Sequence, residues 1–393
     1  MKKIAVLGGG IYQVPLIRRA REKGYHVTVA SLRNDDPGMI LAHEPWVVDL
    51  NDHDTILDLV RKNNIDAVTT TGTEFSIPTI GHIHDELGLP GVSLETALIS
   101  TNKILAQKRF AEANVPAARF RGVGTLNGAL DAAEDIGYPV YIKAPDSSGS
   151  RGISMVEDPN GMEPAFTEAL QTSKKNEVLV EEMLSGIEIG AQVIVVDGDV
   201  THCLCHNDTV TAPPITVPVG HSLPFRESEE IQREARDVCA AAVKALNIGN
   251  AVCNADLIAT PKGVRLFEIG ARIGATGLAE IVDLHHGINL YDVALAMALG
   301  ERPVIHQQDG SAAAYFIIQA PDTGKLIHRS VPDEIREREG IVEIHFDYPE
   351  GAEVRKFRTG PDRIGHILVT AEDVDSAENL ARDIAGKLDI RVN

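Results

Sequence analysis

Short apolar runs alternate with amphipathic segments along the first 95 residues. The apolar runs have strand length, and the segments between them place apolar residues at helical spacing. Strands are predicted at 4–8, 25–30, 47–49 and 67–71, with helices at 15–23 and 54–62. Because strands that are separated by helices pair in parallel, this pattern predicts an open parallel sheet of the α/β class.

Beyond residue 100 the pattern is of mixed α+β type. Helices are predicted from 101 toward 114, and at 127–136, 158–172, 228–246 and 376–388. Two hairpins with suitable turn residues are predicted at 192–205 and 251–269. Between these hairpins, 206–227 contains four prolines and is predicted to be a long irregular segment, either a functional lid or disordered.

Two strand ends in the first region are candidate ligand positions. Gly8 to Gly10 follow the first strand, but Gln13 stands where a dinucleotide fingerprint has its third glycine. A tight turn that shapes the sheet edge is therefore favoured over a nicotinamide site. Glu74 follows a strand at the edge where open sheets place ligands, which makes it a candidate substrate contact. A helix start, with Thr73 as the cap and Glu74 complementing the dipole, is equally supported.

The segment 138–153 carries Lys143 from a predicted strand into a loop of small and hydroxylated residues. Glycines let backbone N–H groups approach an anion closely, and Lys143 and Arg151 add positive charge for phosphate oxygens. An ordinary β-hairpin turn explains the same composition. On this loop alone the turn is favoured, so a phosphate site depends on the rest of the chain.

Glutamates surround a predicted break between two strands at 177–190. Glu181 and Glu182 end the first strand, a short connector follows, and Glu188 enters the second strand. Backbone groups beside the apolar Met183 and Leu184 suit the edge and faces of a purine, and Glu188 could accept hydrogen bonds from ribose hydroxyls. The alternative is a solvated sheet edge.

Asp256 and Glu268 interrupt the apolar runs of two adjacent predicted strands. Two carboxylates directed to one place repel each other unless a cation lies between them. Two side-chain oxygens, completed by phosphate and water, suit Mg²⁺. Arg272 follows in a glycine-rich turn, where a fixed guanidinium would stabilise phosphoryl transfer. The alternative places the two carboxylates on opposite faces, each in a salt bridge.

Lys103 and His221 are two further candidate functional residues, because of their positions in the sequence. Lys103 lies in the first turn of a predicted helix, where a cation is unfavourable to the helix dipole, and this misfit leaves room for a functional role. A solvated surface lysine is the alternative. His221 lies within 206–227 and either contacts substrate or caps the next turn, with substrate contact slightly favoured.

Composition narrows the classes of function. The net charge of −20 argues against wholesale nucleic-acid binding, and no apolar run is long enough to cross a membrane. Four cysteines without a second pair at zinc-ligand spacing indicate reduced core thiols and a cytoplasmic location.

The order and spacing of these residues resemble the ATP-grasp enzymes. Within that superfamily the chain is most similar to carboxylate–amine ligases of the L-amino-acid-ligase type, with kinship to biotin carboxylase and carbamoyl-phosphate synthase. The resemblance covers nearly the whole chain and implies three domains. These are a Rossmann-like domain at 1–98, an ATP-grasp domain at 99–300 with a nucleotide-binding small lobe at about 115–185, and a C-terminal α+β lobe at 301–393.

The resemblance also implies a role for each site residue. Phosphate contacts would come from Lys103 and Lys143, beneath a mobile loop containing Ser147, Ser148, Gly149, Ser150 and Gly152. The adenine amino group would meet Glu181, with Glu182, Met183 and Leu184 as the hinge and Glu188 at the ribose. Asp256 and Glu268 would hold Mg²⁺, and Arg272 would face the γ-phosphate and the acyl-phosphate.

The implied reaction is attack of a carboxylate on ATP to give an acyl-phosphate and ADP, followed by capture by an amine. The cofactors would be ATP and one or two Mg²⁺ ions, which Mn²⁺ could replace. The partners would be small-molecule substrates, without nucleic acid or membrane, and a homodimer is a possible assembly. Gly270 stands where the family usually has Asn, which puts the second metal ion in question. Alternatives are a bicarbonate-activating carboxylase of the same fold and a nucleotide-binding regulator with a degenerate metal site.

Overall fold

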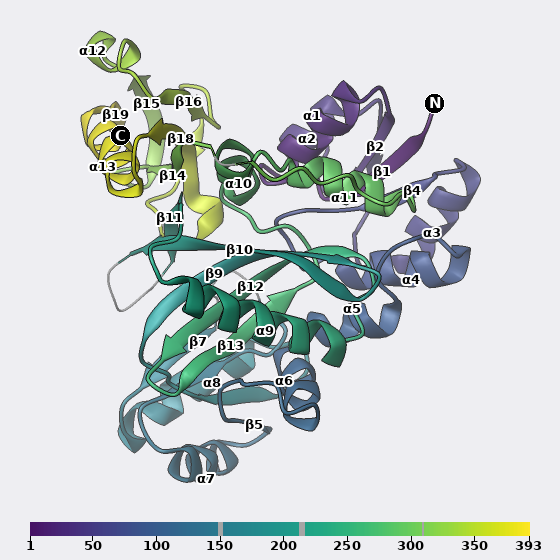
Figure 1. Ribbon diagram of the computed structural model, residues 1–393, viewed down its shortest axis with the longest axis vertical. Coiled ribbons are helices and arrows are strands. Elements are labelled where there is room, and N and C mark those ends of the chain that lie inside the picture. Colours follow the sequence, from purple (N-terminus) through teal and green to yellow (C-terminus); the bar gives the residue numbers. More distant parts are fainter. Residues whose placement is uncertain (148–151, 212–216, 309) are drawn as a thin grey trace. The chain divides into compact units, whose positions relative to one another are not determined.

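The computed structural model describes residues 1–147, 152–211, 217–308 and 310–393, which form two compact units (Figure 1). The first unit comprises Met1–Cys203, Ser228–Ile273 and Ala294–Pro303. The second comprises Leu204–Glu227, Gly274–Val293 and Val304–Asn393. The predicted combination of α/β and α+β architecture is confirmed.

The N-terminal part of the first unit is a four-stranded parallel sheet. Its strands, in the spatial order β3-β2-β1-β4, are β3 (Glu44–Val47), β2 (His26–Ser31), β1 (Lys3–Leu7) and β4 (Ala67–Thr69). The helices are α1 (Val14–Glu22), α2 (Pro37–Leu41), α3 (His53–Lys62) and α4 (Ile77–Leu87). The strand predicted at 47–49 is corrected to β3. Sequence periodicity did not predict α4, because this helix buries Thr79, Gly81 and His84 where an apolar stripe would be expected.

The side chain of Gln13 fills the turn that follows β1. Gly8 has φ +119°, and the Gln13 side chain lies against it. Gln13 Nε2 donates to the carbonyl of Thr71 at 2.5 Å, and its Oε1 accepts from the Gly10 N–H at 3.0 Å. The predicted tight turn is therefore confirmed, because Gln13 satisfies the turn internally.

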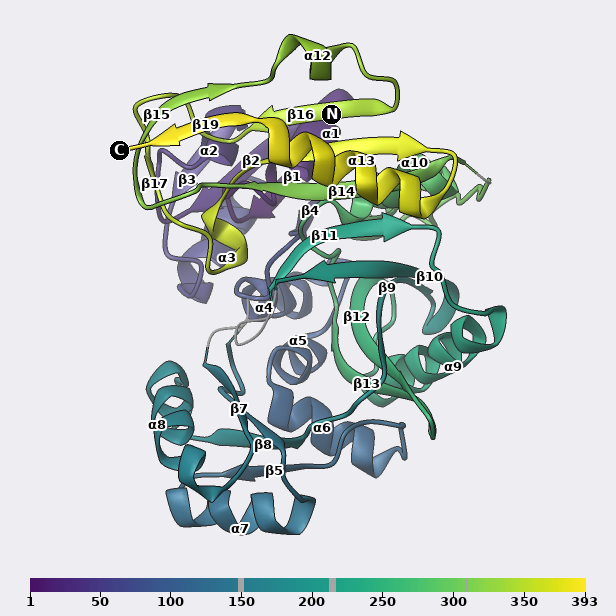
Figure 2. The same cartoon turned by 90° about the vertical axis from the view of Figure 1, so that its left-hand side faces the viewer.

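A four-stranded antiparallel sheet follows in the first unit. Its order is β5 (Phe120–Val123), β8 (Val178–Glu182), β6 (Val140–Lys143) and β7 (Ile153–Val156). In Figure 2, α7 (Leu126–Ile136) and α8 (Met162–Thr172) lie against this sheet. One apolar core contains residues of both helices and of β6, β7 and β8, so the helices cover the same face.

The rest of the first unit is built on long antiparallel strands. They are β9 (Ile187–Val196), β12 (Ala251–Thr260) and β13 (Gly263–Gly270), with the start of β10 (Asp199–Val210) beside β9. The helices of this region are α5 (Leu94–Ser100), α6 (Lys103–Glu112) and α9 (Glu229–Ala245). α9 packs on β12 and β13 with one apolar face, including Ala235 and Ala242.

The second unit contains the end of β10 followed by four strands in the order β11, β14, β18 and β16. Their bounds are β11 (Pro218–Leu223), β14 (Ala312–Gln319), β18 (Arg363–Ala371) and β16 (Ile341–Phe346). A smaller sheet has the order β17 (Glu353–Val354), β15 (Gly324–Ser330) and β19 (Asp389–Val392). The helices are α10 (Leu278–His286), the first residues of α11 (Leu290–Ala298), α12 (Asp333–Arg336) and α13 (Val374–Lys387).

The prediction that 206–227 is irregular is wrong for most of its described residues. β10 continues to Val210 and pairs antiparallel with β11. Pro218 begins β11 and Pro224 follows its end, so these two prolines flank a strand without interrupting its ladder. Residues 212–216 lie outside the described residues.

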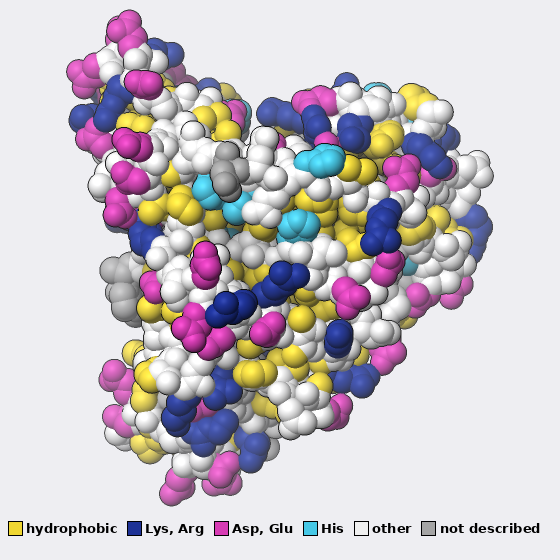
Figure 3. Space-filling model, in the orientation of Figure 1, with side chains coloured by type: hydrophobic (Ala, Val, Ile, Leu, Met, Phe, Trp, Pro, Cys, Tyr) yellow, Lys and Arg dark blue, Asp and Glu magenta, His cyan; other side chains and the backbone are white. Residues whose placement is uncertain are grey.

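The described surface is mixed in charge. Lys and Arg side chains are interspersed with Asp and Glu over most of the face shown in Figure 3, and a group of Lys and Arg side chains gathers at its lower left. Within the described ranges, no helix combines the length and the apolar character that crossing a membrane requires.

Replacing Gly277 by alanine is expected to destabilise the second unit strongly. Gly277 has φ +77°, and an added Cβ would lie 1.9 Å from the Tyr315 ring. Gly198 is a matched control, because it has φ +82° with no atom within 4 Å of an added Cβ. Urea unfolding should show a cost of about 1–2 kcal/mol for Gly198→Ala from backbone strain alone, and about 1–3 kcal/mol more for Gly277→Ala from overpacking. Equal losses in the two variants would contradict a packing role for Tyr315.

Candidate active site

Asp256 and Glu268 lie directly opposite each other on neighbouring strands. The antiparallel register of β12 and β13 pairs Asp256 with Glu268, so their side chains leave the same face of the sheet. The alternative that placed them on opposite faces is therefore wrong. Oxygen donors brought together in this way fit a hard cation such as Mg²⁺. Asp256 is exposed, and the Glu268 side chain is about one-third exposed, which leaves room for a further ligand.

Lys103 is held between Glu268 and the predicted phosphate loop. Its Nζ donates to Glu268 Oε1 and to the carbonyl of Ser147, both at 3.0 Å. Burial alone would lower the pKa of Lys103, but the Glu268 and Glu74 carboxylates outweigh it and raise the pKa above its ordinary value. Lys103 is therefore a positioned cation of the site, and the interpretation as a solvated surface lysine is wrong.

Glu268 remains ionised in this environment. Burial opposes its charge, but Lys103, Lys143 and Arg272 outweigh that effect and lower the pKa of Glu268. Three basic side chains from three different elements therefore face one carboxylate. Such a concentration of fixed positive charge suits a polyanionic ligand with a bound cation.

Lys143 forms an ion pair with Glu181 at the centre of the small sheet. β6 and β8 are hydrogen-bonded neighbours, and Lys143 Nζ donates to Glu181 Oε2. Glu181 is 1% exposed and also accepts from Gln107 Nε2 at 3.1 Å. Lys143 therefore has a protein partner in addition to its expected phosphate contact, and removing it would strand a buried carboxylate.

Glu74 and Arg272 form a second ion pair, although 198 positions separate them in the chain. Each side chain is 14% exposed. α4 begins at Ile77, so the interpretation of Glu74 as part of a capped helix start is wrong. A Cβ on Gly270 would lie 3.2 Å from Glu74 Oε1. The bare glycine therefore leaves the space that the Glu74 carboxylate occupies.

The predicted hinge has the expected backbone arrangement. Met183 and Leu184 lie half-buried between β8 and β9, and Glu188 is exposed near the start of β9. Glu182 accepts from the Arg119 N–H at 3.1 Å and pairs with its guanidinium at 3.3 Å. Its side chain is therefore engaged with Arg119, and only its backbone remains a candidate for nucleotide contact.

The predicted phosphate loop is described only at its two ends. Ser148, Gly149, Ser150 and Arg151 lie outside the described residues. Ser147 precedes them, and Gly152 follows with φ +64° and its carbonyl accepting from the Ala144 N–H at 2.9 Å. Left-handed geometry at Gly152 explains why glycine stands at this end of the loop.

Several buried polar atoms around this cluster have no hydrogen-bond partner among the described residues. They include Gln107 Oε1, Ser147 Oγ and Arg272 Nε. Buried polar atoms are normally paired, and a ligand rich in donors and acceptors would supply the missing partners. Together with the opposed carboxylates, these atoms fit a nucleotide with its magnesium ion.

Three contributors to the site were not predicted from the sequence. Gln107 Nε2 donates to Glu181. The centroid of the Phe267 ring lies 5.5 Å from Lys143 Nζ. Asn254 Nδ2 donates to Asp256 Oδ1 at 3.2 Å. Asn254 also lies opposite Gly270 in the β12–β13 register. Only Asn254 carried a sequence signal, because a residue two positions before Asp256 on a strand shares its face.

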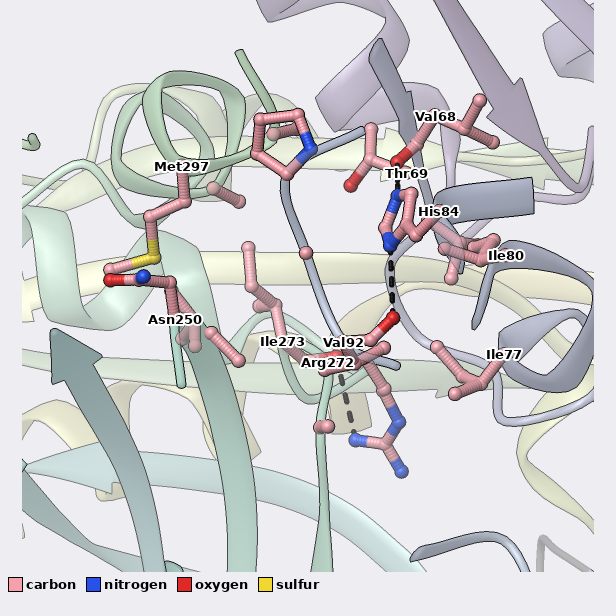
Figure 4. A pocket seen from close by; sticks show the side chains of 18 residues that line it. Val68, Thr69, Ile77, Ile80, His84, Val92, Asn250, Arg272, Ile273 and Met297 are labelled. Carbon is pink, nitrogen blue, oxygen red and sulfur yellow. Dashed lines mark hydrogen bonds between the residues drawn. The ribbon is translucent and has the colours of Figure 1, made fainter. Parts of the chain in front are cut away.

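A cavity of about 70 Å³ lies beside Arg272 in the first unit (Figure 4). Its walls are mainly apolar, including Ile80, Ile273 and Met297, and in Figure 4 the Arg272 guanidinium extends away from them. A volume of this size holds about two water molecules, whereas ligand pockets measure about 300–1,000 Å³. This cavity is therefore too small to be the nucleotide site.

His221 belongs to the second unit, whereas the residues described above belong to the first unit. Its Nδ1 contacts Asp208 Oδ1 at 2.6 Å. The suggestion that His221 caps a turn is wrong, because it lies inside β11. Its contact with substrate stays a prediction.

Comparison with known proteins identifies the family. The model of the carbamoyl-phosphate synthase L chain ATP-binding domain matches residues 102–303, just over half of the chain. The chain belongs to this family of ATP-grasp ligases. A second model, the L-amino acid ligase C-terminal domain 2, matches residues 316–393 of this ATP-grasp ligase.

Sequence similarity to individual relatives extends over most of this ATP-grasp ligase. A formate-dependent phosphoribosylglycinamide formyltransferase from Ignicoccus hospitalis is 23% identical over 99% of this chain and 96% of its own. An L-arginine-specific L-amino acid ligase from Bacillus subtilis is 22% identical over 83% of this chain and 80% of its own.

Solved structures share the fold. A phosphoribosylglycinamide synthetase from Anaerococcus prevotii has a TM-score of 0.83 with 28% identity, and covers all of both chains. An L-amino acid ligase from Bacillus licheniformis has a TM-score of 0.86 with 21% identity, over 100% of this chain and 99% of its own.

The protein is thus an ATP-dependent carboxylate–amine ligase that uses ATP and Mg²⁺. Its homologues act on small-molecule substrates. When bound, ATP supplies the phosphoryl group that activates the carboxylate, and Mg²⁺ neutralises charge on its phosphates. The side chains of this site contribute position and fixed charge, which are the main requirements of phosphoryl transfer.

Proposed function

We propose that this ligase joins the carboxylate of an amino acid or short peptide to the amine of a second amino acid. The observation that carries the proposal is the Glu74–Arg272 ion pair, because it places one acidic and one basic side chain together beside Asp256 and Glu268. A guanidinium binds carboxylates in a planar fork, and a carboxylate binds an ammonium group. The pair therefore offers one partner for each charged group of an amino acid. The match of residues 316–393 to an L-amino acid ligase domain supports the same substrate class.

We assign the residues of the site as follows. Lys103 and Lys143 contact the ATP phosphates, together with the loop from Ser147 to Gly152. Glu181 faces the adenine amino group, the backbone of 182–184 forms the hinge, and Glu188 binds the ribose. Asp256 and Glu268 hold Mg²⁺, and Arg272 stabilises charge on the transferred phosphoryl group. The contacts that support this assignment are the hydrogen bonds of Lys103 and the ion pairs of Lys143 and Arg272.

Formate-dependent formylation of a phosphorylated ribosylamine is the second candidate function. Its support is the match to formyltransferases over 98–99% of this chain in the first two relatives. Bicarbonate activation is the third candidate function. Its support is the fold shared with a biotin carboxylase domain at a TM-score of 0.82.

An ADP-release assay separates these functions. The enzyme is supplied with Mg-ATP and either pairs of amino acids, formate with phosphoribosylglycinamide, or bicarbonate alone. The proposal expects ADP only when an amino acid or peptide carboxylate and an amine are both present, with the ligated product found by mass spectrometry. Turnover in the formate or bicarbonate arm alone would overturn it. Asp256→Asn is the matched control, in which every arm should fall to background because Mg²⁺ loses a ligand.

Two other features remain proposals. A net charge of −20 and the mixed surface of Figure 3 support partners that are small molecules and not nucleic acids. Four cysteines without a disulfide among the described residues support a cytoplasmic location. A homodimer and a second metal ion stay predictions.

A further inference from the structure

Two histidines and an aspartate converge on one face of the β10–β11 ladder in the second unit. Asp208 lies opposite His221 in the antiparallel register, and His206 precedes Asp208 by two positions. Residues i and i+2 of a strand share a face, as do cross-strand partners, so the fold directs all three side chains to one place. One ligand atom from each residue lies within 4.8 Å of the others.

Both polar contacts within this cluster are made to the same oxygen of the Asp208 carboxylate. Asp208 Oδ1 lies 2.8 Å from His206 Nδ1 and 2.6 Å from His221 Nδ1. The two imidazole rings are perpendicular, with centroids 5.3 Å apart. His206 is 1% exposed and His221 is 5% exposed. Both imidazoles are therefore buried side chains of the fold.

The ligand atoms that the cluster offers are two imidazole nitrogens and one carboxylate oxygen. Two imidazoles with one carboxylate are ligands that suit zinc and other first-row transition metals, whereas Mg²⁺ and Ca²⁺ prefer oxygen-only sites.

We propose that His206, Asp208 and His221 bind a divalent transition metal ion, of which Zn²⁺ is the best fit. The ion would take the place of the two Nδ1 protons. For bonds of about 2.0–2.2 Å, ligand atoms in a tetrahedral shell lie roughly 3.3 Å apart. The two oxygen–nitrogen separations of 2.8 and 2.6 Å therefore need to widen by about 0.5–0.7 Å when the ion binds. Water or a small anion completes the shell.

This site differs from the magnesium site of the ligase in both residues and chemistry. Asp256 and Glu268 belong to the first unit and offer only oxygen, whereas this cluster belongs to the second unit and offers two nitrogens. The proposal therefore does not depend on the ligase function. Cys205 also lies on β10, but alternation places it on the opposite face from His206, so sulfur is not expected among the ligands.

Cobalt and zinc titrations of the metal-stripped full-length protein test the proposal. Wild type should take up one Zn²⁺ with saturating Mg²⁺ present, and Co²⁺ in its place should give visible absorption bands. His206→Gln and His221→Gln should each weaken Zn²⁺ binding by at least tenfold. The matched control is His286→Gln. His286 forms a pair with His285, with ring centroids 4.6 Å apart, and this variant should retain Zn²⁺ binding. Asp256→Asn should also retain it, because that residue belongs to the other site.

X-ray absorption spectroscopy of the zinc-loaded wild-type protein identifies the ligand atoms around zinc. This measurement does not depend on whether the variants fold. Two imidazole ligands with oxygen would support the site. Sulfur ligation, oxygen-only ligation or no zinc uptake by wild type would overturn it, as would unchanged uptake in folded His206→Gln and His221→Gln proteins. In those cases the cluster is a hydrogen-bonded carboxylate–imidazole network alone.

Discussion

Arg272→Met is expected to lower the rate of ADP release by about 10²- to 10³-fold, the usual effect of removing one fixed donor from a developing charge. The Arg272 side chain is 14% exposed and lies in the cluster that contains Glu74, Asp256 and Glu268. Because its guanidinium is assigned both to the transferred phosphoryl group and to the substrate carboxylate, kcat should fall and KM for the carboxylate substrate should rise. The measurement is steady-state ADP release with the substrate pair found in the panel assay.

The same variant should also unfold more easily, because it strands the Glu74 carboxylate. Breaking one side of a buried ion pair costs about 3–5 kcal/mol, whereas removing both charges is often close to neutral. Glu74→Gln/Arg272→Met should therefore recover most of the stability lost in the single variant, but not its turnover. Recovery of turnover in the double variant, or full activity of Arg272→Met, would contradict the assignment of Arg272 to phosphoryl transfer.

Lys143→Ala is expected to abolish detectable turnover and also to reduce the stability of the nucleotide-free protein. Its partner Glu181 has a side chain only 2% exposed, so the variant leaves an almost fully buried carboxylate without its cation. A loss of about 3–5 kcal/mol in the free energy of unfolding is expected for such a change. Calorimetry should in addition show weaker Mg-ATP binding, because Lys143 is assigned to the phosphates.

Two comparisons isolate the contribution of the pair. Lys108→Ala removes an exposed lysine of α6 and should change neither stability nor ATP binding measurably. Lys143→Met/Glu181→Gln removes both charges and should regain stability while remaining inactive. If Lys143→Ala unfolds like wild type, Glu181 does not depend on the lysine; if it binds Mg-ATP like wild type, the phosphate assignment is wrong.

Local pattern was sufficient for much of the first unit, but it predicted no element between 270 and 375. Alternation of apolar runs with helical segments predicted the parallel strands β1, β2 and β4, and turn residues predicted the β12–β13 hairpin. These features depend on residues close together in the chain, where backbone preference and side-chain period act directly. Local pattern failed at α4, which buries Thr79 and His84, and at β11, whose flanking prolines resembled a loop.

For the site, the sequence by itself determined which residue types were present, in what order, and hence the resemblance to ATP-grasp ligases. Only the tertiary structure decided their partners: Arg272 with Glu74, Lys143 with Glu181, and Asp256 beside Glu268 on one face. The same is true of the His206–Asp208–His221 cluster, whose cross-strand register no spacing in the sequence reveals. The physical reason is that contacts between distant segments are fixed by packing and strand register, whereas hydrophobic period reports only which way each segment faces.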